Sequence, residues 1–449
     1  QSGSAFKPFV LATALDEGIA TSQTFVSKPV VIAQGGDFWS VHNYEGAYQG
    51  RINLEQATVF SDNSVYAQLT AHAGPARVAQ VANDLGIGRE LDPFLSIGLG
   101  TDAVSPLDMA RAYATFATGG GRVDGKLLGN VPRAVLAVQD GDELQTNDAV
   151  RTRVLDQNDA AILTSILQKV VREGTGRRAR LSGYAAAGKT GTTENFGDAW
   201  FVGYTPQISV AVWVGYPDEL RPMLSEFDGK PVAGGTFPAL IWKSFVEKAL
   251  AEMGEPRRPF RQPHYQSTKQ VRVVSRNGEW LRDNGRCTNT RTVVYYSDKT
   301  PDRVAPCKRN EVEVPDLIGE RLVTAETRLA QQPLQPDLLS RVAEPGEKLG
   351  VVVDQFPKRG TLSSYDTVRL VVAKATEGVV PNVVGLPLLE AQDLLVKRRL
   401  QPVAAGEGEG QAGVVVSQSP SPRVAAAPGM QVELIVGGSS PDAAKSPRG

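Results

Sequence analysis

The sequence predicts a mixed α/β protein in which a large N-terminal domain is followed by a small α+β module that occurs twice. Residues 156–171 carry apolar side chains at helical spacing after polar capping residues. Residues 199–204 and 208–215 are rich in β-branched and aromatic side chains and flank a short proline-containing turn, which is typical of an antiparallel hairpin. The sequence VPDLIG at 314–319 returns as VPNVVG at 380–385, which indicates an internal repeat.

The remaining elements follow from similar patterns. Residues 106–117 begin with proline and end before a glycine run, which predicts a second helix. Beyond residue 250 the chain is rich in Arg, Pro and Gln and has one strand-like stretch at 292–296. Each repeat combines one helical stretch with a few valine-rich strands. We therefore expect an N-terminal domain at 1–250, a connector at 251–310, repeats at 311–375 and 378–438, and a disordered tail at 439–449.

Composition excludes several classes of function. Lys and Arg total 48 against 49 Asp and Glu, a net charge of -1, so bulk charge gives no support to nucleic-acid binding. Three histidines and no CxxC pair argue against a structural zinc site, and we expect neither metal nor cofactor. Cys287 and Cys307 form a disulfide if the compartment is oxidising; the alternative is two unpaired thiols.

No segment of the sequence approaches the roughly 18 apolar residues that span a bilayer. The chain begins at Gln1 rather than Met, and a candidate motif follows within four residues. We therefore expect a fragment or a processed product, with any membrane anchor or export signal lying upstream.

Three short motifs occur in order along the N-terminal domain. They are SAFK at Ser4–Lys7, SDN at Ser61–Asn63 and KTGT at Lys189–Thr192. Any one of them arises by chance in many proteins: the first as a surface lysine, the second as a turn or cap, the third as the end of a strand. The ordered set is far more specific, since S-x-x-K, S-D-N and K-T-G together are typical of serine acyl-transfer enzymes.

The spacing of the first motif suits nucleophilic catalysis. A serine hydroxyl is a poor nucleophile until a base takes its proton. Lys7 follows Ser4 by three residues, which places both on one helix face. Burial and cationic neighbours can lower a lysine pKa from about 10.4 by several units, so that the amine accepts a proton near neutrality. Pro8 suits the first turn, which leaves Ser4 at a helix N-terminus favourable to developing negative charge.

The sequences that flank the motifs resemble a known family. Residues 6–9, 43–57, 97–120, 187–206 and 237–245 are similar to the transpeptidase domain of class A, bifunctional penicillin-binding proteins. The resemblance covers residues 1 to about 247 and implies a penicillin-binding/β-lactamase-like fold, with a central antiparallel sheet flanked by helices. The C-terminal repeats resemble PASTA domains. The implied parent protein is extracytoplasmic, with a glycosyltransferase domain and a membrane anchor upstream.

The resemblance implies a set of catalytic residues. Ser4 would attack the D-Ala–D-Ala bond of a peptidoglycan stem peptide, with Lys7 as the base. Ser61 would relay a proton to the leaving group, and Lys189 would set the local field. The amine of a second stem peptide would then accept the acyl group, and β-lactams would trap Ser4.

The resemblance also implies the groups that bind substrate. Asn63 would hold the substrate amide. Thr190, Gly191 and Thr192 would bind the terminal carboxylate, and the backbone amides of Ser4 and Thr192 would form the oxyanion hole. In this family, strands of the sheet precede the nucleophile helix and this chain has none, so we expect an exposed sheet edge.

Two alternative functions remain. A β-lactamase or D,D-carboxypeptidase would pass the acyl group to water, and Glu143 with Asn147 has the four-residue spacing of a deacylating pair. A non-catalytic penicillin sensor or wall-binding protein would use the same fold without turnover. For the repeats, recognition of uncross-linked peptidoglycan stands against a role as spacers.

Overall fold

The computed structural model describes most of the chain, and its contacts divide the chain into two compact units. The first comprises residues 1–273 and 291–303, and the second 274–290 and 304 onward. The tail expected at 439–449 lies outside the described residues. The described residues are 1–34, 37–127, 132–276, 278–308, 310–344, 347–374 and 378–438.

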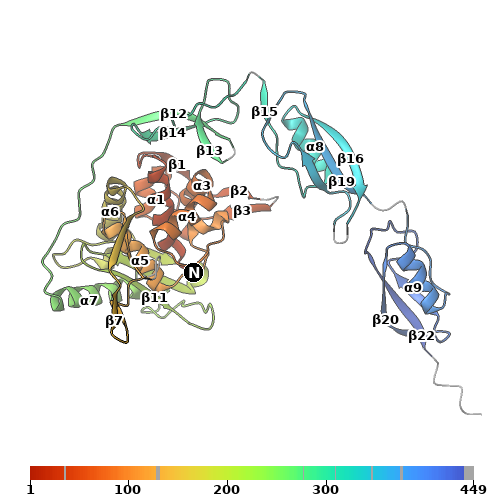
Figure 1. The fold of residues 1–449 in the computed structure, drawn as a ribbon, viewed down its shortest axis with the longest axis horizontal. Helices are drawn as coiled ribbons and strands as arrows, with labels where there is room; N and C mark the ends of the chain where they lie inside the picture. The colour runs from red at the N-terminus through yellow and green to blue at the C-terminus, as the bar shows by residue number, and fades with distance from the viewer. Residues whose placement is uncertain are drawn as a thin grey trace, which may run out of the picture. The chain divides into compact units, whose positions relative to one another are not determined.

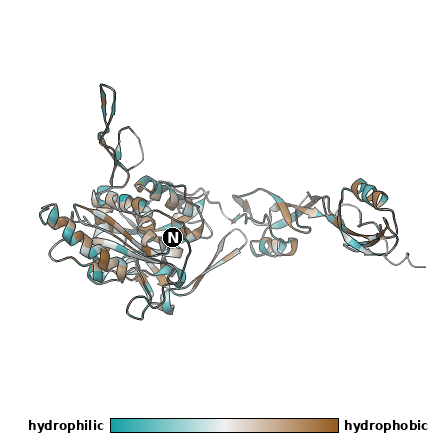
Figure 2. Ribbon diagram, turned by 90° about the horizontal axis from the view of Figure 1, so that it is seen from below, coloured by the Kyte–Doolittle hydropathy of each residue, from teal (hydrophilic) through white to brown (hydrophobic). Residues whose placement is uncertain are grey.

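The first unit contains a three-stranded antiparallel sheet covered by helices on both faces (Figure 1). Strands β10 (Asp198–Tyr204) and β11 (Ser209–Gly215) form the predicted hairpin, and β9 (Ala187–Thr192) pairs with the other edge of β10. All residues of β10 are buried, and Figure 2 shows hydrophobic residues along these central strands. The sheet therefore forms the centre of the unit, with β9 and its KTGT sequence at one edge.

Aromatic side chains attach helices to both faces of the sheet. On one face Phe201 packs edge-on against Trp242 of helix α7 (Phe237–Glu252), with ring centroids 5.2 Å apart. On the other, Tyr204 shares a 2.9 Å hydrogen bond with Thr164 of α6 (Gln157–Arg172) and lies near Tyr113 of α5 (Pro106–Ala117). This alternation follows from the two-residue period of a strand.

The helices of the first unit include both predicted from sequence. The helix expected at 106–117 is α5, and the helix expected at 156–171 is α6, which begins one residue later because Asp156 caps it. Among the described residues no helix is both long and apolar enough to cross a membrane. The α-helices are α1 (Lys7–Asp16), α2 (Leu54–Val59), α3 (Asn63–Ala73), α4 (Pro75–Leu85), α5 (Pro106–Ala117), α6 (Gln157–Arg172) and α7 (Phe237–Glu252).

Short two-stranded sheets surround this core. Strand β1 pairs with β4, β2 with β3, β5 with β8 and β6 with β7, all antiparallel. Their bounds are β1 (Thr24–Ser27), β2 (Val30–Gln34), β3 (Asp37–Val41), β4 (Gly50–Asn53), β5 (Gly121–Gly125), β6 (Ala137–Asp140), β7 (Glu143–Thr146) and β8 (Ala149–Arg153).

The segment expected as a connector contributes one whole strand and most of a second to the first unit. Strand β14 (Arg291–Tyr296) pairs with residues 268–273 of β12 (Thr268–Arg276). It also bonds to the chain that follows α1: Ala20 N–H donates to the Val294 carbonyl at 2.8 Å, and Tyr296 N–H to the Gly18 carbonyl at 2.9 Å. The compact unit therefore extends past the expected boundary at 250. Sequence patterns report local periodicity and carry no signal for a pairing between residues this far apart.

In the second unit, Cys287 and Cys307 form a disulfide, with Cα atoms 5.1 Å apart. Both cysteines are buried against Val274, Leu281 and Ala305. Strand β13 (Glu279–Arg282) belongs to the same region. Of the two readings left open by the sequence, the structure contains the disulfide.

The two repeats have the same fold. In the first, α8 (Leu322–Gln331) packs on a sheet in which the strand after the helix is parallel to the closing strand, and the valine-rich strand is antiparallel to it. The second repeats this order with α9 (Leu388–Lys397). The strands are β15 (Glu311–Glu313), β16 (Gln335–Val342), β17 (Val352–Phe356), β18 (Thr361–Ser363) and β19 (Thr367–Lys374), then β20 (Gln401–Glu409), β21 (Val415–Ser419) and β22 (Gln431–Gly438).

One glutamine occupies the same position in both repeats. Gln355 accepts a hydrogen bond from Leu317 N–H at 2.7 Å and donates to the Pro315 carbonyl at 2.9 Å. In the second repeat, the Gln418 side chain bonds likewise to Val383 N–H and the Pro381 carbonyl, at 2.7 and 3.1 Å. The conserved geometry ties the VPxxxG segment of each repeat to its valine-rich strand.

Candidate active site

Ser4 lies on a short 3-10 helix, η1 (Gly3–Phe6), that leads directly into α1. Lys7 N–H donates to the Ser4 carbonyl, so the backbone continues from one helix into the other. Ser4 is half-buried, whereas Lys7, the first residue of α1, is completely buried. The predicted placement of the two side chains one turn apart is therefore retained, although the first turn is 3-10 rather than α.

The η1 turn is held tightly against strand β9. A Cβ on Gly191 would lie 2.1 Å from the Ser2 carbonyl oxygen, and one on Gly3 would lie 2.7 Å from the Thr192 carbonyl oxygen. Tyr113 from α5 donates a buried 2.6 Å hydrogen bond to the Ala5 carbonyl. Glycine at both positions thus allows the backbone around Ser4 to contact the backbone of the KTGT segment.

Lys7 joins the first motif to the second. Its Nζ donates to the Ser61 carbonyl and to Asn63 Oδ1, both at 2.7 Å, and lies 3.3 Å from Ser61 Oγ. The Tyr66 ring lies beneath the ammonium group, with its centroid 5.3 Å from Nζ. These contacts fix the Lys7 side chain over the SDN segment.

Lys189 joins the third motif to the second. From β9, its Nζ donates to Ser61 Oγ at 2.8 Å and to the Thr190 carbonyl at 3.1 Å. Ser61 Oγ therefore lies within hydrogen-bonding distance of two lysines. Three motifs separated by 57 and 128 residues (61 minus 4, 189 minus 61) meet at this hydroxyl group. Within the described structure Ser4 Oγ makes no hydrogen bond of its own, which leaves it available to a substrate.

The environment lowers the pKa of both lysines. Burial, followed by the charge of Lys189, holds the pKa of Lys7 well below its usual value, and Asp62 opposes this shift. Burial alone lowers the pKa of Lys189 to about 7. Because desolvation disfavours the ammonium form, both amines lose a proton more readily than an exposed lysine, and Lys189 does so near neutral pH.

Asp62, the central residue of SDN, supports the loop. It caps α3 by accepting from Val65 N–H at 2.9 Å and also accepts bonds from Ser27 and Asn43. Its neighbour Ser61 has a φ of 61°, a strained conformation for a residue other than glycine. The buried Asp62 network offsets this strain and points the Ser61 side chain toward the lysines.

Asn43 is the most important supporting residue that sequence reasoning missed. Its Oδ1 accepts from the backbone N–H groups of Asn63 at 2.9 Å and Ser64 at 3.0 Å. Its Nδ2 donates to the Ala47 carbonyl at 2.8 Å and to Asp62. In the sequence, Asn43 is distinguished only by its position at the start of the stretch 43–57. The resemblance of that stretch to a known family does not indicate that Asn43 bonds to the SDN segment.

The three predicted carboxylate-binding residues lie on or at the end of β9. Thr190 shares a 2.7 Å hydrogen bond with Thr175, and the Thr192 hydroxyl accepts from Gly234 N–H at 3.1 Å. Gly191 lies between them against η1. Thr175 and Gly234, which orient these hydroxyls, were not identified from the sequence because each lies in an otherwise featureless loop.

The residues of the alternative β-lactamase site do not meet the three motifs. Glu143 lies on the exposed hairpin β6–β7, where its carboxylate accepts from Gln145. Asn147 is buried and bonds instead to Leu127 N–H and the Val135 carbonyl, both at 2.9 Å. The four-residue spacing therefore has a structural origin: Glu143 lies on the hairpin, and Asn147 bonds to the backbone of neighbouring segments.

Comparison with known proteins gives a consistent result. The family profile described as "Penicillin binding protein transpeptidase domain" matches residues 1–237, and the "PASTA domain" profile matches residues 378–438. Penicillin-binding protein 1A of Neisseria gonorrhoeae is 33% identical over 316 residues, which cover 69% of this chain and 38% of that protein. The corresponding protein of Aquifex aeolicus is 33% identical over 249 residues, 55% of this chain and 33% of that protein. The chain thus spans about a third of the length of these relatives.

Solved structures agree in fold. The penicillin-binding protein PonA1 from Mycobacterium tuberculosis is 29% identical, with a TM-score of 0.52 over 59% of this chain and 72% of that one. A second structure of PonA1, in complex with penicillin V, has a TM-score of 0.51 at the same identity and coverage. The family profile covers more than half of the chain and includes all three motifs that meet at Ser61. The chain therefore belongs to the penicillin-binding protein transpeptidase family and carries a C-terminal PASTA domain.

Proposed function

We propose that this chain is the serine D,D-transpeptidase part of a bifunctional cell-wall enzyme. It cross-links peptidoglycan stem peptides through an acyl-enzyme on Ser4 and is a target of β-lactams. The observation that carries the proposal is the convergence of Lys7 and Lys189 on Ser61 Oγ, where Lys7 follows by three residues a half-buried serine whose side chain makes no hydrogen bond in the described structure. Such an arrangement provides a nucleophile, a base and a proton path in one place.

Acylation begins with transfer of the Ser4 hydroxyl proton to neutral Lys7. Ser4 Oγ then bonds to the carbonyl carbon of the penultimate D-Ala, and the negative charge moves onto the carbonyl oxygen. The backbone N–H groups of Ser4 and Thr192 stabilise that oxyanion. As the peptide bond breaks, the leaving D-Ala nitrogen takes a proton through Ser61, which Lys7 supplies. The products are an ester on Ser4 and free D-Ala.

The second half of the reaction regenerates the serine. The amine of another stem peptide attacks the ester carbon, loses a proton to the Lys7–Ser61 pair, and forms a new amide as the Ser4 oxygen leaves and is reprotonated. A β-lactam acylates Ser4 by opening its ring, so its leaving nitrogen stays attached and blocks the acceptor. The complex of PonA1 with penicillin V is in keeping with this outcome.

Substrate recognition would use the groups around the lysines. Thr190, Gly191 and Thr192 bind the C-terminal carboxylate of the donor, assisted by the positive field of Lys189. Asn63 binds the amide of the peptide backbone through its side chain. This division of roles is supported by the buried positions of Lys189 and Thr190, since a charge in a low-dielectric site acts more strongly on a bound carboxylate.

The C-terminal repeats would bind uncross-linked peptidoglycan outside the cytoplasmic membrane. The PASTA match at 378–438 and the same topology in residues 311–374 support two copies of one module. A parent protein of the penicillin-binding protein 1A type would supply the membrane anchor and the glycosyltransferase activity.

Covalent labelling with a fluorescent penicillin tests the proposal. We expect the purified chain to form a long-lived adduct, and Ser4→Ala to form none. Ser22→Ala, a loop substitution outside the three motifs, is the matched control and should label as the wild type does. Labelling that persists in Ser4→Ala, or an adduct that hydrolyses within seconds, would contradict the assignment, the latter in favour of a β-lactamase. If even the wild type stays unlabelled, the same labelling is repeated on a chain extended upstream. Labelling of the extended chain would mean that the sheet of the shorter chain is incomplete. No labelling would mean that the assignment is wrong.

A further inference from the structure

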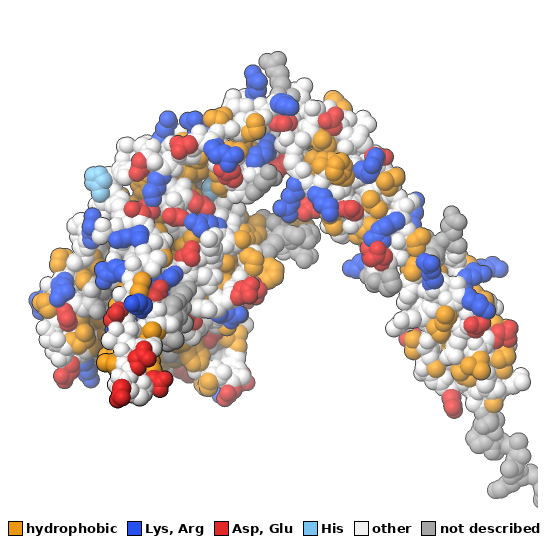
Figure 3. All heavy atoms as spheres, viewed as in Figure 1, with side chains coloured by type: hydrophobic (Ala, Val, Ile, Leu, Met, Phe, Trp, Pro, Cys, Tyr) orange, Lys and Arg blue, Asp and Glu red, His pale blue; other side chains and the backbone are white. Residues whose placement is uncertain are grey.

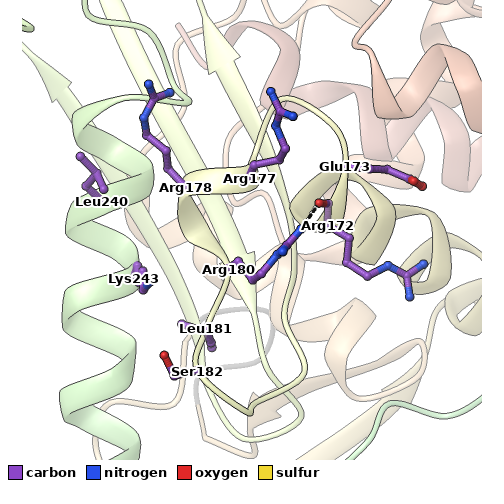
Figure 4. A pocket seen from close by; sticks show the side chains of 9 residues that line it. All are labelled: Arg172, Glu173, Arg177, Arg178, Arg180, Leu181, Ser182, Leu240 and Lys243. Atoms are coloured by element: carbon purple, nitrogen blue, oxygen red, sulfur yellow. Dashed lines mark hydrogen bonds between the residues drawn. The ribbon is translucent and has the colours of Figure 1, made fainter.

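The first unit has an open pocket that none of the three motifs lines. Its volume is about 740 Å³, and it lies between the end of α6, the 3-10 helix η4 (Arg177–Ala179) and helix α7 (Figure 4). Its lining residues are Arg172, Glu173, Arg177, Arg178, Arg180, Leu181, Ser182, Leu240 and Lys243.

The lining of this pocket is mainly cationic. Five of the nine lining residues are cationic and one is acidic, while the whole chain has a net charge of -1. On the face shown in Figure 3, blue and red side chains are mixed, which is the usual pattern of a soluble surface. In the described parts of the chain none of the five cations forms an ion pair. The carboxylates at the pocket are Glu173 in the lining and Glu247 of α7, which accepts from Ser182 N–H at 2.9 Å, so the five cations leave an excess of positive charge.

Two of the arginines are held in place by contacts with backbone carbonyl groups or an aromatic ring. Arg180 donates to the carbonyl of Arg172, the last residue of α6, as Figure 4 shows. Arg178 donates to the Gly235 carbonyl at 3.1 Å, and its guanidinium lies 5.4 Å from the ring centre of Phe227. Carbonyl and ring contacts orient these guanidinium groups but leave their charge uncompensated.

The side chains of the other three cations make no such contact within the described structure. Within the described structure no hydrogen bond, ion pair or ring contact is made by the side chains of Arg172, Arg177 or Lys243. Arg172 and Arg177 are exposed, and Lys243 is half-buried on α7 between the buried residues Trp242 and Val246. Lys243 is therefore fixed at its base by the packing of α7, while its ammonium group has no protein partner.

We propose that this pocket binds a phosphate-bearing polyanion. Guanidinium groups match phosphate oxygens in paired hydrogen bonds, and an ammonium group adds a point charge. A single carboxylate would neutralise only one of five charges, whereas an oligomeric phosphate carries several charges and many acceptor oxygens. The lining also includes the buried Leu181 and the exposed Ser182, whose hydroxyl group can donate a further hydrogen bond to a phosphate oxygen. The site is separate from the proposed transpeptidase site, so it does not depend on that function.

Binding of sodium tripolyphosphate to the whole chain, measured by isothermal titration calorimetry, tests the site. The pocket variant is Arg177→Gln with Lys243→Gln. The matched control is Arg261→Gln with Lys248→Gln, which removes the same charge from exposed residues outside the pocket, one of them on the same helix. We expect the pocket variant to bind at least about tenfold more weakly and the control to bind within about twofold of wild type.

Two further probes identify the source and the class of the ligand. Vesicles of phosphatidylcholine with phosphatidylglycerol present the same phosphate as lipid headgroups, and their co-sedimentation, if lost only in the pocket variant, assigns the membrane surface as the source. Tripolyphosphate binding without vesicle binding assigns a soluble phosphate polymer. Polyglutamate binding as tightly as tripolyphosphate overturns the preference for phosphate. Absence of tripolyphosphate and vesicle binding, or equal losses in both double variants, overturns the site itself.

Discussion

The interior of the transpeptidase unit differs from the interior of the repeats. In the first, Lys7 and Lys189 have no exposed surface and Asp62 is 3% exposed. In the described residues of the repeats the only buried polar side chain is Gln355, a neutral amide that bonds to backbone groups. Burying an ionisable group costs free energy, whereas a fully bonded amide secures the fold at little cost. The proposed reactive groups therefore lie in the unit where burial of polar side chains costs more free energy.

The largest effect should come from removing the buried base. We expect Lys7→Ala to lower the rate of penicillin acylation about 10³-fold, or about 4 kcal/mol in activation free energy, because Ser4 loses its proton acceptor. Stopped-flow or gel-based labelling measures this rate. Lys248→Ala, on an exposed face of α7, should leave it unchanged. A rate within about tenfold of wild type, in a variant with native circular dichroism, would remove Lys7 from the role of base.

The second effect concerns pH. Lys7 must be neutral to accept a proton, so acylation should rise with pH until the lowered pKa of Lys7 is passed. Lys189 should be cationic, and with its pKa lowered to about 7 it loses that charge as the pH rises further. The wild-type rate should therefore fall above about pH 7, and at about pH 9 it should lie roughly 100-fold below its maximum.

Lys189→Arg separates the two limbs of this profile. Arginine remains protonated throughout, so the descending limb should vanish even if the absolute rate is lower. The measurement is the ratio of acylation rates at about pH 9 and pH 7 in each protein, which cancels any loss common to both conditions. An unchanged descending limb in the variant would show that another group titrates there.

A third effect should appear in stability. Burial raises the pKa of Glu17, just after α1, to about 8. Because this exceeds the unfolded value of about 4.3, the folded state binds the proton more tightly, and stability is lost as pH rises from about 4 to 8. Glu17→Gln keeps the neutral shape, so it should stabilise the first unit by about 2 kcal/mol at pH 8 and have little effect at pH 5.

Urea unfolding followed by tryptophan fluorescence measures this difference. Glu252→Gln, on the exposed surface of α7, is the matched control and should change stability equally little at both pH values. A Glu17→Gln effect of the same size at pH 5 and pH 8 would mean that titration of this carboxyl group does not contribute.

The smallest effect is expected in the repeats. Gln355→Ala leaves Leu317 N–H and the Pro315 carbonyl without their partner, which should destabilise the first repeat by about 1 kcal/mol. Hydrogen exchange should show faster exchange in that repeat alone, with penicillin labelling unchanged. Gln335→Ala, exposed at the start of β16, is the control. Loss of labelling in Gln355→Ala would contradict the view that the repeats contribute nothing to the chemistry of Ser4.

The sequence by itself determined the local elements and displayed the three motifs from which the candidate site residues are proposed. Residues 106–117 and 156–171 became α5 and α6, and the hairpin of β10 and β11 formed as expected. The period of 66 residues (380 minus 314) became two copies of one fold. These features depend on periodicity, capping and turn residues within a few positions of one another, which a single sequence displays.

Only the tertiary structure decided how these parts meet. Ser61 as the shared partner of two lysines, Asn43 as the support of the SDN loop, and β14 bonded to residues 18–20 all join segments distant in the chain. The basic pocket likewise combines α6, η4 and α7. Such contacts depend on packing in three dimensions, which local patterns do not encode. The pKa values of Lys7 and Lys189 follow from that packing, since burial is their leading cause.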